Sequence, residues 1–90
     1  MAALSKKKII VAVAAEFDVK PEYIGLDKFE GEYYWIGKLP ALFTGTCIYI
    51  NNLSQWPLSR WIEDFKFKLK ESELSGDLNA KVEAINWEVE

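Results

Sequence analysis

The chain has 90 residues, of which 50% are hydrophobic and 14% aromatic, and its formal net charge is −3. This length fits a single domain, residues 1–90, and the apolar content is enough to form a core without a disulfide or a metal. Tight binding of duplex nucleic acid is not expected from this acidic chain, because it requires clustered Lys and Arg side chains. The single cysteine, Cys47, cannot form an internal disulfide and favours a reducing, cytoplasmic compartment.

The first expected element is a helix over residues 6–17, with Ser5 as its N-cap. Ile9, Ile10, Val13 and Phe17 fall on one helical face. The apolar run 9–15 also fits a buried strand, and after three lysines it imitates a secretory signal. We favour a helix because Pro21 ends it and Val19 and Ile24 can pack back on it. No apolar run approaches the roughly 20 residues needed to span a bilayer, so no membrane association is predicted.

Residues 15–24 read Ala15-Glu16-Phe17-Asp18-Val19-Lys20-Pro21-Glu22-Tyr23-Ile24. This pattern resembles the first helix and following loop of acyl carrier proteins. The Asp-Ser-Leu element that carries the phosphopantetheine in that family is absent from the sequence. The resemblance therefore implies no carrier function, and we expect no cofactor.

Residues 29–50 predict a β-hairpin at the centre of the fold. Two runs rich in aromatic, β-branched and Thr residues flank residues 38–41, and Pro40 cannot donate to a ladder, so we expect the reversal there. Pairing symmetric about Leu39 and Pro40 gives two faces. The first holds Tyr33, Trp35, Leu42, Thr44, Thr46 and Ile48, and the second holds Tyr34, Ile36, Phe43, Gly45, Cys47 and Tyr49. We expect the second face to be core, although a register shift of one residue would turn Trp35 inward.

The strongest helix signal runs from Leu58 to about residue 75, directly after Pro57. Its apolar stripe consists of Leu58, Trp61, Ile62, Phe65 and Leu69. Phe67 points away from this stripe, among Arg60, Glu63, Lys70 and Glu71. We therefore expect the Phe67 side chain to be exposed.

The last segment, residues 81–90, alternates polar and apolar residues and predicts a strand, with a short helix over residues 78–85 as the competing interpretation. The expected fold is a small α+β domain in the order α-β-β-α-β. Its antiparallel sheet is centred on the hairpin and carries two helices on one face. The final strand is expected to join an edge of the hairpin.

The residue types that most enzymes and metal sites use are scarce in this sequence. There is no histidine, the commonest general base and transition-metal ligand, and one cysteine cannot form a structural zinc site. No glycine-rich phosphate-binding loop occurs. The paired carboxylates, Glu30 with Glu32 and Glu63 with Asp64, are expected to be solvated. We therefore predict a protein that is not an enzyme and binds no metal, with a carboxylate-based enzyme as an alternative.

The surplus of aromatic residues suggests a binding surface instead. Tyr, Trp and Thr have an apolar body and a polar group, as interfaces prefer. The expected partner-binding residues are Tyr33, Trp35, Thr44, Thr46 and Phe67. We expect a small non-catalytic interaction module, an adaptor, inhibitor, regulator or subunit, that binds another protein or a second copy of itself. The alternative is a platform for single-stranded nucleic acid or a flat ligand on the same aromatic residues.

Overall fold

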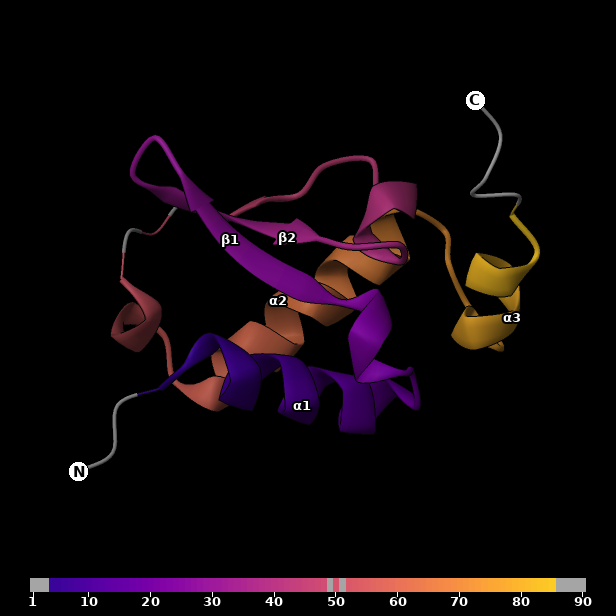
Figure 1. Ribbon diagram of the computed structural model, residues 1–90, viewed down its shortest axis with the longest axis horizontal. Helices are drawn as coiled ribbons and strands as arrows, with labels where there is room; N and C mark the ends of the chain where they lie inside the picture. The colour runs from indigo at the N-terminus through magenta and orange to yellow at the C-terminus, as the bar shows by residue number, and fades with distance from the viewer. Residues whose placement is uncertain (1–3, 49, 51, 86–90) are drawn as a thin grey trace.

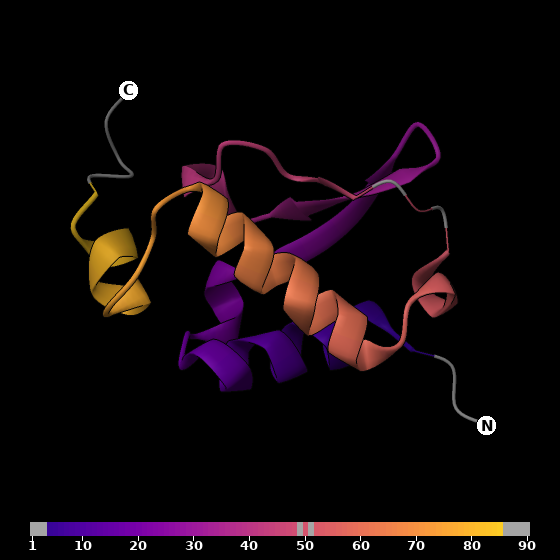
Figure 2. The same cartoon turned by 180° about the vertical axis from the view of Figure 1, so that it is seen from behind.

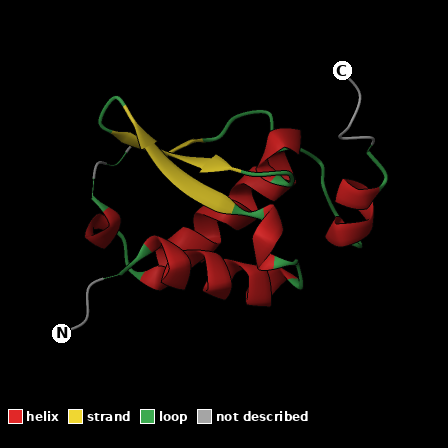
Figure 3. Ribbon diagram, in the orientation of Figure 1, coloured by secondary structure: helices red, strands yellow, loops and turns green. Residues whose placement is uncertain are grey.

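The computed structural model describes residues 4–48, 50 and 52–85, which form a small α+β fold (Figures 1 and 3). Three strands form one antiparallel sheet in the order β1-β2-β3. The elements are α1 (Lys6–Phe17), β1 (Gly25–Phe29), β2 (Glu32–Ile36), β3 (Cys47–Ile48), α2 (Leu58–Glu71) and α3 (Leu78–Glu83). Helices α1 and α2 lie on one side of the sheet, and Figure 2 shows α2 running obliquely across it. These features confirm the expected fold class, although all three strands precede α2.

Helix α1 begins and ends where the sequence predicts. The Ser5 hydroxyl accepts a hydrogen bond from the Lys8 backbone N–H at 3.2 Å, which caps the first turn. Asp18 then adopts a left-handed conformation, and the Val19 N–H donates to the Ala14 carbonyl at 2.9 Å. Val19 and Ile24 are buried, so the loop after α1 packs back on the core as expected.

The tightest hairpin joins β1 and β2, a pairing that was not predicted. Glu30 and Gly31 form its turn with positive φ values of 51° and 85°. Two successive residues with positive φ match the twist of the paired strands. The expected reversal around residues 38–41 is confirmed, since β2 and β3 pair antiparallel, but the connection between them, residues 37–46, is longer than a tight turn. That connection contains a short 3-10 turn, Pro40–Leu42.

Strand β3 pairs with β2 in a register that differs from the symmetric one. Tyr33 lies opposite Ile48 and Tyr34 opposite Cys47, whereas symmetry about Leu39 and Pro40 would pair Tyr33 with Thr46. This displacement is an even number of residues. Because side chains alternate between the two faces of a strand, an even displacement leaves the membership of each face unchanged.

The core lies on the face that carries Trp35, so the prediction that Tyr33 and Trp35 form a contact surface is wrong. Trp35 is 1% exposed, and Tyr33 and Ile48 beside it are buried. The Trp35 ring packs edge-on against Trp61 at 5.8 Å and Phe65 at 4.8 Å between centroids. The polar groups of Tyr and Trp suggested a surface in contact with water. The Trp35 indole N–H instead donates to the buried Asp64 carboxylate.

Helix α2 packs its aromatic side chains on the Trp35 face of the sheet. Trp61, Phe65 and Leu69 are buried, as the stripe predicts, while the helix ends at Glu71 rather than near residue 75. Pro57 occupies the N-cap position, where its missing N–H costs no helical hydrogen bond. Within the described residues, no helix has the length and apolar character to cross a membrane.

The C-terminal part of the described chain is helical where a strand was expected. Asp77 caps α3 by accepting from the Ala80 N–H at 3.1 Å, and Leu78 and Val82 are buried. The strand predicted over residues 81–90 is therefore wrong at Lys81–Glu83, and the competing helix is correct there. Residues 86–90 lie outside the described residues. Within the described chain, the strand that joins the edge of the expected hairpin is β1, which precedes the hairpin in the sequence instead of following α2.

Polar contacts hold α3 against the loop after α1. The Asn79 side chain accepts from the Lys20 N–H at 2.9 Å and donates to the Asp18 carbonyl at 3.2 Å. Glu83 accepts from the Tyr23 hydroxyl at 2.8 Å and from the Lys20 ammonium at 3.1 Å. These hydrogen bonds, first that of Tyr23 and then that of Lys20, lower the pKa of the Glu83 carboxyl.

We expect acid to weaken this α3 contact through Glu83. A carboxyl whose pKa is lowered by folding contributes stability above its unfolded pKa, about 4.3, and loses it as the pH falls through the folded value. Urea midpoints measured from neutral to acidic pH should fall more steeply for the wild type than for Glu83→Gln. Parallel curves for the two proteins would contradict this prediction.

Candidate functional site

Strand β3 is an edge of the sheet. Within the described residues it has β2 on one side and no strand on the other. The Trp35 N–H donates to the Thr46 carbonyl at 3.1 Å, which makes Trp35 and Thr46 a hydrogen-bonded pair. Hydrogen-bonded and non-hydrogen-bonded pairs alternate in an antiparallel ladder, so Cys47, the next residue, directs its N–H and C=O away from β2. These backbone groups face the open edge.

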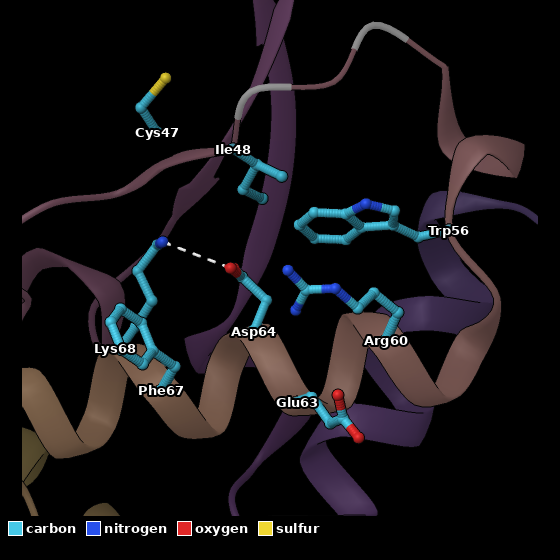
Figure 4. Close-up of a pocket in the computed structure, with 8 residues that line it drawn as sticks. All are labelled: Cys47, Ile48, Trp56, Arg60, Glu63, Asp64, Phe67 and Lys68. Carbon is cyan, nitrogen blue, oxygen red and sulfur yellow. Dashed lines mark hydrogen bonds and ion pairs between the residues drawn. The ribbon is translucent and has the colours of Figure 1, made fainter.

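A groove runs beside this edge, between β3 and α2. Its main hollow, of about 630 Å³, is lined by Cys47, Ile48, Trp56, Arg60, Glu63, Asp64, Phe67 and Lys68 (Figure 4). A second hollow of about 260 Å³ is lined by Thr44, Gly45, Thr46, Cys47, Phe67, Lys68 and Glu71. The two hollows share Cys47, Phe67 and Lys68, and we call them together the edge groove. The main hollow has the volume of a typical ligand site.

The middle of the edge groove is formed by a buried carboxylate. Asp64 is a buried residue of α2 and accepts from the Trp35 indole N–H at 2.9 Å. Its other oxygen lies 3.5 Å from the Lys68 ammonium, one helical turn further on. The expectation that Asp64 is solvated like Glu63 is wrong, because Asp64 satisfies a core tryptophan. Its negative charge is balanced locally by Lys68.

The two ends of the groove differ in character (Figure 4). At one end, the Arg60 guanidinium lies 4.4 Å from the centre of the Trp56 ring, a cation–π distance. Trp56 in turn packs on Trp61 with ring centres 5.1 Å apart, which holds it in place. At the other end, Phe67 is 58% exposed, which confirms the expected exposure of this side chain. The groove thus has an ordered aromatic end and an open aromatic end.

Three of the five expected partner-binding residues line this groove: Thr44, Thr46 and Phe67. The other two, Tyr33 and Trp35, belong to the core. Sequence reasoning missed Trp56, Arg60 and Lys68. The sequence did contain a signal for a site here, because Asp64 lies three residues after Trp61, on the buried side of the helix. Arg60 lies one turn before Asp64, and Lys68 lies one turn after it. A charged residue on that side predicts partners around it.

The Cys47 thiol adds little chemistry of its own. It is half-buried, and its Sγ lies 3.9 Å from the Glu32 carboxylate. Within the described residues, no three His, Cys, Asp or Glu side chains come together in an arrangement that could hold a metal ion. The groove is therefore defined by backbone, aromatic and paired charged groups.

Together these features describe a class: a small α+β protein whose antiparallel sheet has an open edge above a groove on its covering helix. No family model, curated protein or solved structure shows significant similarity to the chain.

Proposed function

We propose that the protein is a small non-catalytic interaction module that takes an extended segment of a partner protein into the edge groove. The segment adds to β3 as a further strand, with backbone hydrogen bonds to Cys47, as in other cases of recognition by strand addition. The observation that carries the proposal is the outward-facing backbone of Cys47 beside the exposed Phe67. Thr44 and Thr46 line the second hollow, where the Thr44 N–H donates to the Ser72 hydroxyl at 2.9 Å.

The groove also supports a preference for the side chains of that segment. Side chains of an added strand alternate between the two faces of the sheet, so every second one enters the space between Trp56 and Phe67. Asp64 and Lys68 balance each other there, and Arg60 is engaged with Trp56. Apolar side chains therefore suit these positions better than charged ones.

The stacking platform for single-stranded nucleic acid or a flat ligand has less support. It relied on Tyr33 and Trp35, and both rings are buried in the core.

Substitution at Cys47 tests strand addition. Cys47→Pro removes the outward N–H and leaves the ladder between β2 and β3 intact, because proline is tolerated on an edge strand where its nitrogen faces away from the sheet. The matched control, Cys47→Ala, keeps that N–H and removes only the thiol. The probe is a linear peptide selected on the wild-type protein from a displayed random library. Calorimetry should show that Cys47→Pro raises the Kd for this peptide by roughly tenfold or more, a loss of about 1.4 kcal/mol in binding free energy. Cys47→Ala should leave the Kd unchanged.

A second variant, Phe67→Ser, tests the side-chain part of the groove. Because the ring is exposed, the free energy of unfolding should change by about 0.5 kcal/mol or less, whereas peptide binding should weaken. A peptide that binds Cys47→Pro as well as wild type would contradict strand addition. Failure of the wild-type protein to enrich any peptide would count against the proposed function itself.

A further inference from the structure

The face of the sheet turned away from the helices exposes apolar side chains. Phe29 is 63% exposed and Ile36 is 45% exposed. The strand register puts Tyr34 on this face too, and its ring meets Phe29 edge-on with 6.5 Å between ring centres. Within the described residues, no helix covers this face (Figures 1 and 2). We call it the outer sheet face.

Carboxylates surround these apolar groups. Asp27 and Glu32 share the outer sheet face, since Asp27 lies two residues from Phe29 and Glu32 two residues from Tyr34 on their strands. Glu30 lies at the adjoining hairpin turn. The pKa of the Tyr34 hydroxyl is raised, first by the Cys47 thiol and further by the charges of Glu32 and Glu30. One lysine balances part of this charge, because the Lys6 ammonium lies 3.8 Å from Asp27. The outer sheet face is thus apolar with an acidic rim.

A second surface of the molecule, on α1, carries the complementary pattern. On the outward surface of α1, a shallow hollow of about 320 Å³ is lined by Ser5, Lys7, Lys8, Val11 and Ala12. Val11 is 49% exposed, and both lysines are exposed. Helix α1 lies beside β1 in Figure 1, and its first residue, Lys6, reaches Asp27 on the outer sheet face. This outer α1 face is apolar with a basic rim.

We propose that a second copy of the chain covers the outer sheet face. The outer α1 face of one molecule packs on the outer sheet face of the next, with Val11 against Phe29 and with Lys7 and Lys8 toward Glu30 and Glu32. Packing two outer sheet faces together would bring like charges into contact, which opposes association. The contact is therefore head-to-tail, because it joins two different surfaces, the outer α1 face of one copy and the outer sheet face of the other.

The arrangement should depend on salt. The charges involved are exposed, and at an ionic strength of 0.15 M the Debye length is only about 8 Å, so added salt screens them. Light scattering at low salt should show a mass that rises with protein concentration, and added salt should reduce it. A protein that stays monomeric at low salt over the full accessible concentration range would overturn the proposal.

Charge-reversal variants test the orientation. Lys7→Glu with Lys8→Glu, and separately Glu30→Lys with Glu32→Lys, should each abolish self-association. Neither pair should unfold the protein. Acidic residues suit the first turn of a helix better than lysines do, and lysine fits the left-handed turn position as well as glutamate does. The four substitutions combined in one chain exchange both rims and should restore self-association.

A matched control separates local from global charge. Lys66→Glu with Lys70→Glu, on the exposed side of α2, changes the net charge as much as the α1 pair and should leave association unchanged. Equal loss in this control, or no restoration in the fourfold variant, would overturn the head-to-tail contact. Phe67→Ser should not affect association, so this result and the peptide-binding result are independent.

Discussion

Trp35→Ala should lower the free energy of unfolding by about 3 to 5 kcal/mol, the range for truncating a buried tryptophan. The side chain is 1% exposed and packs edge-on against both Trp61 and Phe65. Its loss leaves a cavity and also removes the N–H that Asp64 accepts from. A domain of this kind has a total stability of only about 5 to 15 kcal/mol, so the variant should be largely unfolded well below the wild-type midpoint.

Urea denaturation followed by circular dichroism measures this effect. The control is Ile36→Ala on the same strand, which truncates a partly exposed side chain on the outer sheet face and should cost about 1 kcal/mol or less. The double variant Tyr33→Ser with Trp35→Ser should fail to fold as a monomer. Similar losses for Trp35→Ala and Ile36→Ala would mean that the core does not lie on the face assigned to it.

The two long helices were predictable because their signals are local. In α2, Trp61, Phe65 and Leu69 recur at helical spacing, and both helices begin beside a residue suited to that position, Ser5 or Pro57. The short helix α3 was ambiguous. Its residues alternate in a manner that also fits a strand, while the N-cap hydrogen bond from Ala80 to Asp77 and the burial of Leu78 and Val82 both stabilise the helix.

The sheet was harder to predict, because its turn and its buried face depend on distant residues. Glu30 takes the first turn position, which Asn or Asp usually occupies, so residues 29–36 read as one continuous strand. The choice of core face depended on a partner for Trp35 that comes from α2, twenty-nine positions along the chain. Alternation along a strand predicts which residues share a face, and it does not predict which face a helix will cover.

The candidate site was predictable only where a local pattern was sufficient. Phe67 could be assigned to the surface from the helical pattern alone, since it points away from the buried stripe. Thr44 and Thr46 were chosen because they share a face with Trp35, which proved to be the core face, yet both line the edge groove. Arg60 and Lys68 could have been found one helical turn on either side of Asp64, whereas Trp56 required the packing of the loop before α2, which no local pattern encodes.

The buried ion pair has a role that substitution can separate into parts. Asp64 and Lys68 are 11% and 15% exposed in their side chains, and Asp64 also holds the Trp35 N–H. Lys68 has a long, flexible stem and can carry its ammonium toward solvent when the carboxylate is absent. The indole N–H cannot move in this way, because its ring is packed on both sides.

Asp64→Ala should therefore lower the free energy of unfolding by about 1 to 3 kcal/mol, chiefly because it leaves the buried Trp35 donor without an acceptor. Asp64→Asn keeps an acceptor oxygen and should lose clearly less, and Lys68→Met, which removes only the ammonium, should lose least. Urea midpoints of the three variants, measured beside the wild type, test this order. An Asp64→Ala variant as stable as Lys68→Met would show that the contact between Asp64 and Trp35 contributes nothing, because loss of the ion pair alone would then account for both results.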